Sequence, residues 1–150
     1  MRAVVQRVSR AAVRVNGETK SEIGPGLLVL LGVEKGDGPE DVEYISQKIP
    51  HLRIFADKQD KMNRSAAESQ LPVLMVSQFT LAGDVRRGRR PDFTSAEDPA
   101  RAETLFNECC EQVRRDAALT VKTGVFGARM DVELVNDGPV TILLDSRKRI

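Results

Sequence analysis

The sequence is poor in the residues that many hydrolases use for acid–base and metal chemistry. Its 150 residues include one histidine, His51, and two cysteines, Cys109 and Cys110. No cysteine or histidine has the spacing of a zinc site, so we expect neither a metal nor another cofactor. Adjacent cysteines in a helix point in different directions and cannot form an ordinary disulfide with each other. Reduced thiols indicate a cytoplasmic protein.

Aromatic residues and net charge are also scarce. The chain has no tryptophan, one tyrosine and five phenylalanines, which leaves few platforms on which single-stranded bases could stack. The net charge is +1, so a nucleic-acid surface would have to come from clustered residues. Basic clusters occur at Arg86 to Arg90 and at Arg147 to Arg149. Each could bind phosphates or lie solvated on the surface.

Long apolar runs are absent as well. The longest, Leu27 to Leu31, is far below the roughly 20 residues of a membrane helix. The first residues begin a strand without the pattern of a secretion signal. We therefore expect no membrane partner. The length of the chain predicts a single domain over residues 1–150.

Strand patterns dominate what is present. Asn16-Gly17 predicts a hairpin, and the first third is expected to form a β-meander. Helices are predicted from Pro39 to Pro50 and from Asp98 to Asp116, the second with Asp98 as N-cap. Residues 57–71 are predicted to be mainly loop, with a short helix near Ser65. Further strands are expected at Ala3 to Val15, up to Ile23, Leu27 to Val33, His51 to Phe55, Val73 to Val76, Leu119 to Lys122, Met130 to Asn136 and Val140 to Asp145. These elements predict an α+β fold, with a mixed, curved or barrel-like sheet and two main helices packed outside.

The most informative motif is Asn136-Asp137-Gly138-Pro139-Val140-Thr141, which lies between two predicted strands. Its chemistry favours a hairpin turn. Alternatively, because proline tolerates a cis bond and glycine has no side chain, the Gly-Pro dipeptide could present two bare carbonyl oxygens to a pocket.

A second motif, Ser77-Gln78-Phe79-Thr80-Leu81, follows the apolar run Val73 to Val76. Hydroxyl, amide and backbone N–H groups at a strand end could form a small acyl-transfer site. They could equally satisfy the strand's own backbone, with Phe79 in the core. No Gly-x-Ser-x-Gly accompanies Ser77 or Thr80, and His51 is distant in sequence, so a catalytic triad is not indicated.

Together, SQFTL and NDGPVT resemble the D-aminoacyl-tRNA deacylase family, which removes D-amino acids from mischarged tRNA. The resemblance spans nearly the whole chain. It extends to Gln6-Arg7-Val8, Gly26 to Glu34, Lys61-Met62-Asn63, Arg87 to Pro91 and Thr123 to Phe126.

The resemblance implies roles for these residues. Catalysis would involve Ser77, Gln78, Phe79 and Thr80, with the Phe79 and Thr80 N–H groups holding the scissile carbonyl oxygen. A cis Gly138-Pro139 from the partner of a homodimer would reject L-aminoacyl-tRNA and admit D-aminoacyl-tRNA and glycyl-tRNA. Arg7, Asn136 and Met130 would hold the Gly138-Pro139 motif in place. The tRNA would be bound by Arg87, Arg89 and Arg90.

Three alternatives stay open. Thr80 could be a nucleophile rather than part of a site in which the tRNA's 2′-hydroxyl assists water. The chain could be a non-enzymatic nucleic-acid-binding domain that uses the Arg86 to Arg90 loop. It could also be a small-molecule esterase or amidase using Thr80 or Ser77. The resemblance does not specify a role for the charged residues 146–150.

Overall fold

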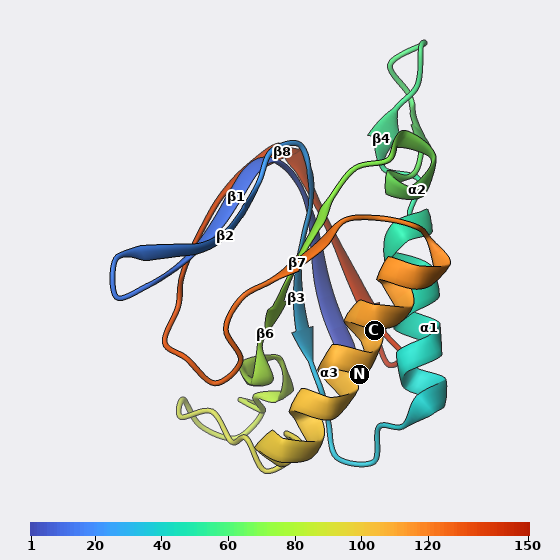
Figure 1. Cartoon of the computed structure of the whole chain (residues 1–150). Helices are drawn as coiled ribbons and strands as arrows, with labels where there is room; N and C mark the ends of the chain where they lie inside the picture. The colour runs from blue at the N-terminus through green and yellow to red at the C-terminus, as the bar shows by residue number, and fades with distance from the viewer.

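The computed structural model describes residues 1–150, which form a curved, six-stranded mixed sheet with helices on one side and a separate two-stranded sheet (Figure 1). Helices α1 and α3 lie together against the sheet, as predicted for the α+β class. No helix is both long and apolar enough to cross a membrane. The main sheet contains β1 (Arg2–Val15), β2 (Glu18–Ile23), β3 (Gly26–Gly32), β6 (Val73–Ser77), β7 (Val121–Thr123) and β8 (Asp131–Asp145). The other elements are α1 (Pro39–His51), β4 (Phe55–Ala56), β5 (Met62–Arg64), α2 (Ala66–Ser69), the 3-10 helix η1 (Phe79–Ala82) and α3 (Pro99–Asp116).

The first three strands do not form the predicted meander. Strands β2 and β3 both pair with the same edge of β1, and their registers are continuous, from Ala11 opposite Ile23 to Val8 opposite Gly26. They behave as one long return strand interrupted between Ile23 and Gly26. The 14 residues of β1 are long enough to pair with both segments in succession, so β3 never pairs with β2.

Strand β3 is central and almost wholly buried, as its apolar run predicts. It pairs antiparallel with β1 and parallel with β6, and β6 pairs parallel with β7. Alternate residues of β1 and β3 point toward the helices and form the main core. The helical residues in this core recur at the expected 3.6-residue spacing. They include Val42, Ile45 and Ile49 of α1 and Leu105, Phe106, Cys109 and Val113 of α3.

The helices match the predictions more closely than the segment that follows α1. Pro50 is buried in the last turn of α1, which ends one residue later at His51. Burial against the core holds the proline in the helix despite its missing N–H group. The strand predicted from His51 to Phe55 is therefore wrong, and β4 covers only Phe55–Ala56. The segment predicted as mainly loop contains β5 as well as the expected short helix α2.

The opposite face of the sheet is not covered by a helix. Val4 lies between Leu30 of β3 and Leu143 of β8 in the strand register, so the three side chains form an apolar row. Val4 and Leu30 are half-buried, and Leu143 is 60% exposed. A free apolar row on a sheet is a feature that a protein interface can cover.

The C-terminal basic cluster is engaged within the chain. Arg149 binds the carboxylates of Glu34 and Asp145. Arg147 donates to Asp37 Oδ1 at 2.7 Å, and that buried carboxylate also lies 2.7 Å from the terminal ammonium of Met1. The cluster therefore fastens residues 145–149 to the segment that joins β3 to α1.

Candidate active site

The NDGPVT motif forms a bulge inside one long strand rather than the hairpin turn that its composition favours. Strand β8 pairs with β1 on both sides of the motif, at Asn136 with Val8 and at Thr141 with Gln6. Between these pairs, residues 137–140 face only Arg7 of β1. The Gly138-Pro139 bond is cis, as the resemblance implies, and Gly138 has φ +135°. The extra residues push Gly138 and Pro139 out of the hydrogen-bonded ladder.

Two side chains hold this bulge in place. The Nδ2 group of Asn136 donates to the carbonyl oxygens of Arg7 and Val140, each at 2.9 Å, and so closes the base of the bulge. Arg7 Nε donates to the Asp137 carbonyl oxygen at 3.0 Å, and its Nη1 donates to the Ile54 carbonyl oxygen at 2.6 Å. The Arg7 side chain is only 15% exposed. It is thus a structural contact of the bulge rather than a free surface arginine.

The SQFTL motif lies at the carboxyl end of β6, where the chain turns into η1. The Gln78 N–H donates to the Leu31 carbonyl oxygen at 2.8 Å, which ties the turn to the end of β3. The first N–H bonded within this turn is that of Leu81, which donates to Gln78 at 3.3 Å. The N–H groups of Phe79 and Thr80 precede it and have no acceptor within the helix. Two successive free N–H groups are the elements of an oxyanion hole.

The Thr80 hydroxyl lacks the base that a nucleophile needs. Its Oγ1 accepts a hydrogen bond from Gln78 Nε2, and no histidine, carboxylate or amine binds it. His51 is the last residue of α1, and its side chain forms no hydrogen bond with either motif. The chain also has no group of three or more His, Cys, Asp or Glu side chains that could hold a metal ion. The arrangement offers hydrogen-bond donors and a polar strand end, but no activated side chain.

A pocket of about 630 Å³ opens beside this strand end. Ser77, Gln78 and Phe79 form one wall, and most of the other lining residues are apolar. Met130, which the resemblance assigns to support of the Gly-Pro motif, lies in this pocket wall with Phe126. The pocket has the mixed lining expected for an organic ligand that is held in place by a few polar groups.

Phe93 is a pocket residue that the sequence did not single out. Its ring meets that of Phe79 edge to face, with centroids 5.2 Å apart and planes at 68°. A Cβ on Gly83 would lie 3.0 Å from Phe93 Cε1, so the ring also packs closely on the backbone after η1. Phe93 thereby supports the turn that carries the free N–H groups. No local pattern around it indicates this long-range contact.

The basic loop follows η1 directly. Backbone hydrogen bonds between Asp84 and Asp92, at 2.8 and 2.9 Å, close its base. Arg86 is paired with Asp84, and its side-chain hydrogen bonds lower the pKa of that carboxyl to about 2. Arg87, Arg89 and Arg90 are exposed and form no ion pair. The three arginines named as candidate tRNA contacts are therefore free to bind phosphate.

Within one chain the two motifs lie at different places on the sheet. Arg7, at the bulge, is opposite Leu27 of β3, whereas Ser77 is opposite Leu31. Four residues along β3 correspond to about 13 Å, and the strands between add to the separation. Neither Gly138 nor Pro139 lines the pocket of its own chain.

The chain has close relatives among known proteins. Residues 4–145 match the family described as D-Tyr-tRNA(Tyr) deacylase. The D-aminoacyl-tRNA deacylase of Natranaerobius thermophilus is 54% identical, with 99% of each chain covered. That of Anaeromyxobacter dehalogenans is 56% identical, also with 99% of each covered.

Solved structures show the same fold. That of a c-Myc DNA unwinding element binding protein superposes with a TM-score of 0.91, at 45% identity, covering 97% of this chain and 98% of the other. A probable eukaryotic D-amino acid tRNA deacylase superposes with a TM-score of 0.81 at 19% identity, covering 95% and 97%.

Proposed function

The chain belongs to the D-Tyr-tRNA(Tyr) deacylase family and is a hydrolase of D-aminoacyl-tRNA, and we propose that Gly138-Pro139 of one subunit rejects L-aminoacyl-tRNA in the pocket of another. One observation carries this proposal. The bulge is exposed and is held by hydrogen bonds from Arg7 and Asn136, yet it does not line the pocket of its own chain. A second subunit can bring the two motifs together.

The uncovered face of the sheet supports a homodimer. The row of Leu30, Val4 and Leu143 is apolar and lacks a helix above it. Strand β8 carries both Leu143 and the Gly138-Pro139 bulge. An interface that buries this face would bring the bulge toward the second subunit, and burial of apolar area would stabilise the assembly at about 25 cal/mol per Å².

Hydrolysis proceeds by positioning and charge stabilisation. The scissile carbonyl oxygen accepts hydrogen bonds from the N–H groups of Phe79 and Thr80, which stabilise the negative charge that develops there. Water adds to the carbonyl carbon, and its proton passes to the leaving ribose oxygen with help from the neighbouring 2′-hydroxyl. The ester C–O bond then breaks and releases the free amino acid and the tRNA. Because the ester is already activated, oriented water and two donors suffice without a protein nucleophile.

Chirality is read at the substrate's Cα. Carbonyl oxygens of Gly138 and Pro139 accept hydrogen bonds from the substrate ammonium and crowd one side of Cα. An L side chain collides with them, and a D side chain points away. Glycine has no side chain and passes the filter, so glycyl-tRNA is a second substrate. Arg87, Arg89 and Arg90 bind tRNA phosphates beside the pocket, and the enzyme acts in the cytoplasm.

The first test compares D-Tyr-tRNA, L-Tyr-tRNA and Gly-tRNA as substrates of the purified protein, with EDTA in parallel. Loss of the D and glycyl esters, with the L ester spared and EDTA harmless, is the expected result. Equal hydrolysis of D and L esters would contradict the role of Gly138-Pro139. Binding of tRNA without hydrolysis would favour the nucleic-acid-binding alternative.

Thr80→Val tests the remaining mechanistic alternative. The variant keeps the backbone N–H and removes the hydroxyl, so kcat should stay within about tenfold of the wild type if donors alone are required. A nucleophile would be indispensable, and its removal would cost far more. A trapped acyl-enzyme in the wild type, absent in Thr80→Val, would establish Thr80 as the nucleophile.

A further inference from the structure

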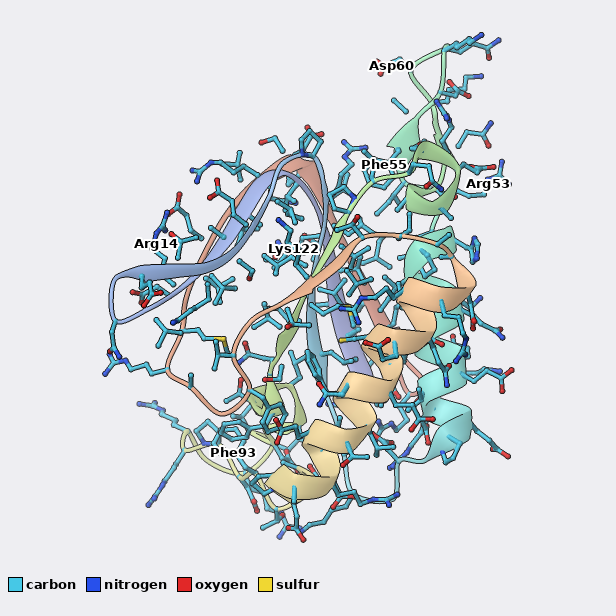
Figure 2. All side chains as sticks on the ribbon, viewed as in Figure 1. Arg14, Arg53, Phe55, Asp60, Phe93 and Lys122 are labelled. Carbon is cyan, nitrogen blue, oxygen red and sulfur yellow. The ribbon has the colours of Figure 1, made fainter.

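The β4–β5 hairpin projects from the body of the molecule (Figure 1), and of its strand residues only Phe55, at the base, packs against the main core. Ala56, Met62, Asn63 and Arg64 are all exposed, Met62 by 60%. Figure 2 places Asp60 at the far tip, at the opposite end of the molecule from Phe93 in the pocket. The segment includes Lys61-Met62-Asn63, which neither the pocket nor the bulge uses. Because these exposed residues add little to the core, the stability of the fold does not explain why the hairpin has a defined structure.

The tip is held in a defined shape by its own hydrogen bonds. The Asp57 carboxylate accepts bonds from the N–H groups of Gln59 and Lys61, at 2.8 and 3.0 Å, and from Asn63 Nδ2 at 3.3 Å. The Asp57 N–H donates to the Lys61 carbonyl oxygen at 2.8 Å. At the base, Arg53 Nε donates to the Asn63 carbonyl oxygen at 2.9 Å. The Asp57 carboxylate is thus used within the turn and does not pair with a lysine.

The hairpin is more basic than the chain as a whole. Residues 53–64 contain four basic side chains, Arg53, Lys58, Lys61 and Arg64, against Asp57 and Asp60, a balance of +2 within 12 residues, whereas the whole chain has +1. All four basic residues are exposed and none forms an ion pair. Of the four, Lys58 and Lys61 lie nearest the tip. Unpaired lysines on an ordered, exposed turn are suited to polyanion binding.

One arginine connects this hairpin to the chirality motif. Arg7 binds the carbonyl oxygen of Ile54, directly before β4, and that of Asp137, directly before Gly138. If the proposed function holds, the bulge enters the pocket of the partner subunit and the hairpin accompanies it. The substrate's 3′ end would then lie between the basic loop of one subunit and the hairpin of the other.

We propose that the β4–β5 hairpin is a phosphate-binding arm, which holds the RNA of a substrate seated in the partner subunit's pocket through Lys58 and Lys61. This inference rests on the proposed function. The arm acts on the polynucleotide and not on the reacting ester. It therefore contributes to tRNA affinity and leaves the chemistry at Phe79 and Thr80 unchanged.

The test uses the full-length double variant Lys58→Ala/Lys61→Ala. Its tRNA affinity should fall, and the slope of log K against log salt concentration should become less steep by about 1–2, because two phosphate contacts no longer release counterions. Hydrolysis of D-tyrosyl-adenosine, which has no phosphate, should stay within about twofold of the wild-type rate, since its ester meets the same oxyanion donors. A matched control, Lys48→Ala/Lys148→Ala, removes the same charge from two exposed lysines elsewhere that also form no ion pair, and it should leave the slope unchanged.

Several results would contradict the proposal that the β4–β5 hairpin binds RNA phosphates. A wild-type salt slope in the hairpin variant would do so, and so would an equal change in the control, which would indicate net charge alone. Loss of D-tyrosyl-adenosine hydrolysis would assign the hairpin to the chemical step, and dissociation of the dimer on size exclusion would assign it to the subunit interface. Failure of the wild type to hydrolyse either D ester would instead contradict the proposed function. The salt slopes of tRNA binding would still test whether the hairpin contacts phosphates.

Discussion

Gly138→Ala is the substitution that most directly tests the bulge. Gly138 has φ +135°, a conformation that side-chain-bearing residues rarely adopt. An added Cβ would lie 2.8 Å from Val140 Cγ2, 3.0 Å from Arg7 Nη2 and 3.0 Å from the backbone nitrogen of Val140. The first two atoms belong to side chains that can move slightly. The third belongs to the bulge itself, so relief requires the bulge to change shape.

The expected cost follows from this geometry. A side-chain-bearing residue held in such a region costs about 1–3 kcal/mol. Because residues 137–139 are exposed, the strain can be released by local displacement while β8 stays paired with β1 on both sides. A displacement favoured by 1–3 kcal/mol reduces the population of the working conformation by about 5–150-fold. We expect kcat/KM for D-Tyr-tRNA to fall within that range.

Gly17→Ala is the matched control. Gly17 also has a positive φ, +79°, but a Cβ there would meet no atom within 4 Å, and it lies at a hairpin tip. Gly17→Ala should lose about 1–2 kcal/mol of stability, and Gly138→Ala should lose no more than the cost of about 1–3 kcal/mol given above; each kcal/mol lowers Tm by about 2–4 °C. Only Gly138→Ala should lose deacylation, measured at equal dimer content by release of D-[14C]tyrosine from tRNA. Wild-type deacylation by Gly138→Ala would refute the role assigned to the bulge.

Three further predictions concern the rest of the molecule. Phe93→Ala should lower kcat by about 3–10-fold, the value of one aromatic contact, while leaving the tRNA Kd unchanged; Phe93→Tyr should restore kcat, and an unchanged kcat in Phe93→Ala would remove its supporting role. Burial raises the pKa of the Cys110 thiol to about 12 and raises that of Cys109, so iodoacetamide at pH 8 should label neither thiol in the native protein. Rapid labelling with loss of activity would contradict this burial. Burial alone would raise the pKa of Asp145, but hydrogen bonds from Arg149 and the Arg147 N–H outweigh it and lower the pKa below 3.8. The ionised form is therefore favoured by folding, so this carboxylate stabilises the fold above that pH and the contribution is lost as pH falls through the folded pKa. Urea titrations from pH 6 to pH 3 should show a smaller decline for Asp145→Asn than for the wild type, and equal declines would argue against the contribution.

The sequence predicts those parts of the fold that depend on local pattern. Apolar spacing and a proline in the first turn predict α1 and α3, and the run at Leu27 predicts a buried strand. The meander was wrong because strand partners are chosen by long-range pairing, and a strand as long as β1 can accommodate two. The strand at His51 was wrong because tertiary burial outweighs the preference of Pro50 to end a helix.

The candidate site shows the same limit. Both motifs were recognisable from their residues. Of the polar residues expected at the end of β6, Ser77 and Gln78 lie in the pocket wall, whereas the Thr80 side chain lies outside it. Whether Gly138-Pro139 forms a turn or a bulge depends on β1, which pairs with β8 on both sides of it. The ring of Phe93 approaches Phe79 only because the Asp84 and Asp92 backbones close the loop between them. Contacts of this kind join residues far apart in the sequence, so the local sequence pattern does not predict them.

Placing the bulge and the pocket on different parts of one chain has a genetic consequence. If the filter is supplied in trans, as proposed, a chain with a damaged bulge keeps an intact pocket, and a chain with a damaged pocket keeps an intact bulge. When two such chains are produced together, their mixed dimer contains one complete site and one doubly defective site. Two alleles that are each inactive alone should therefore complement each other, whereas a single chain damaged in both features cannot be rescued by either.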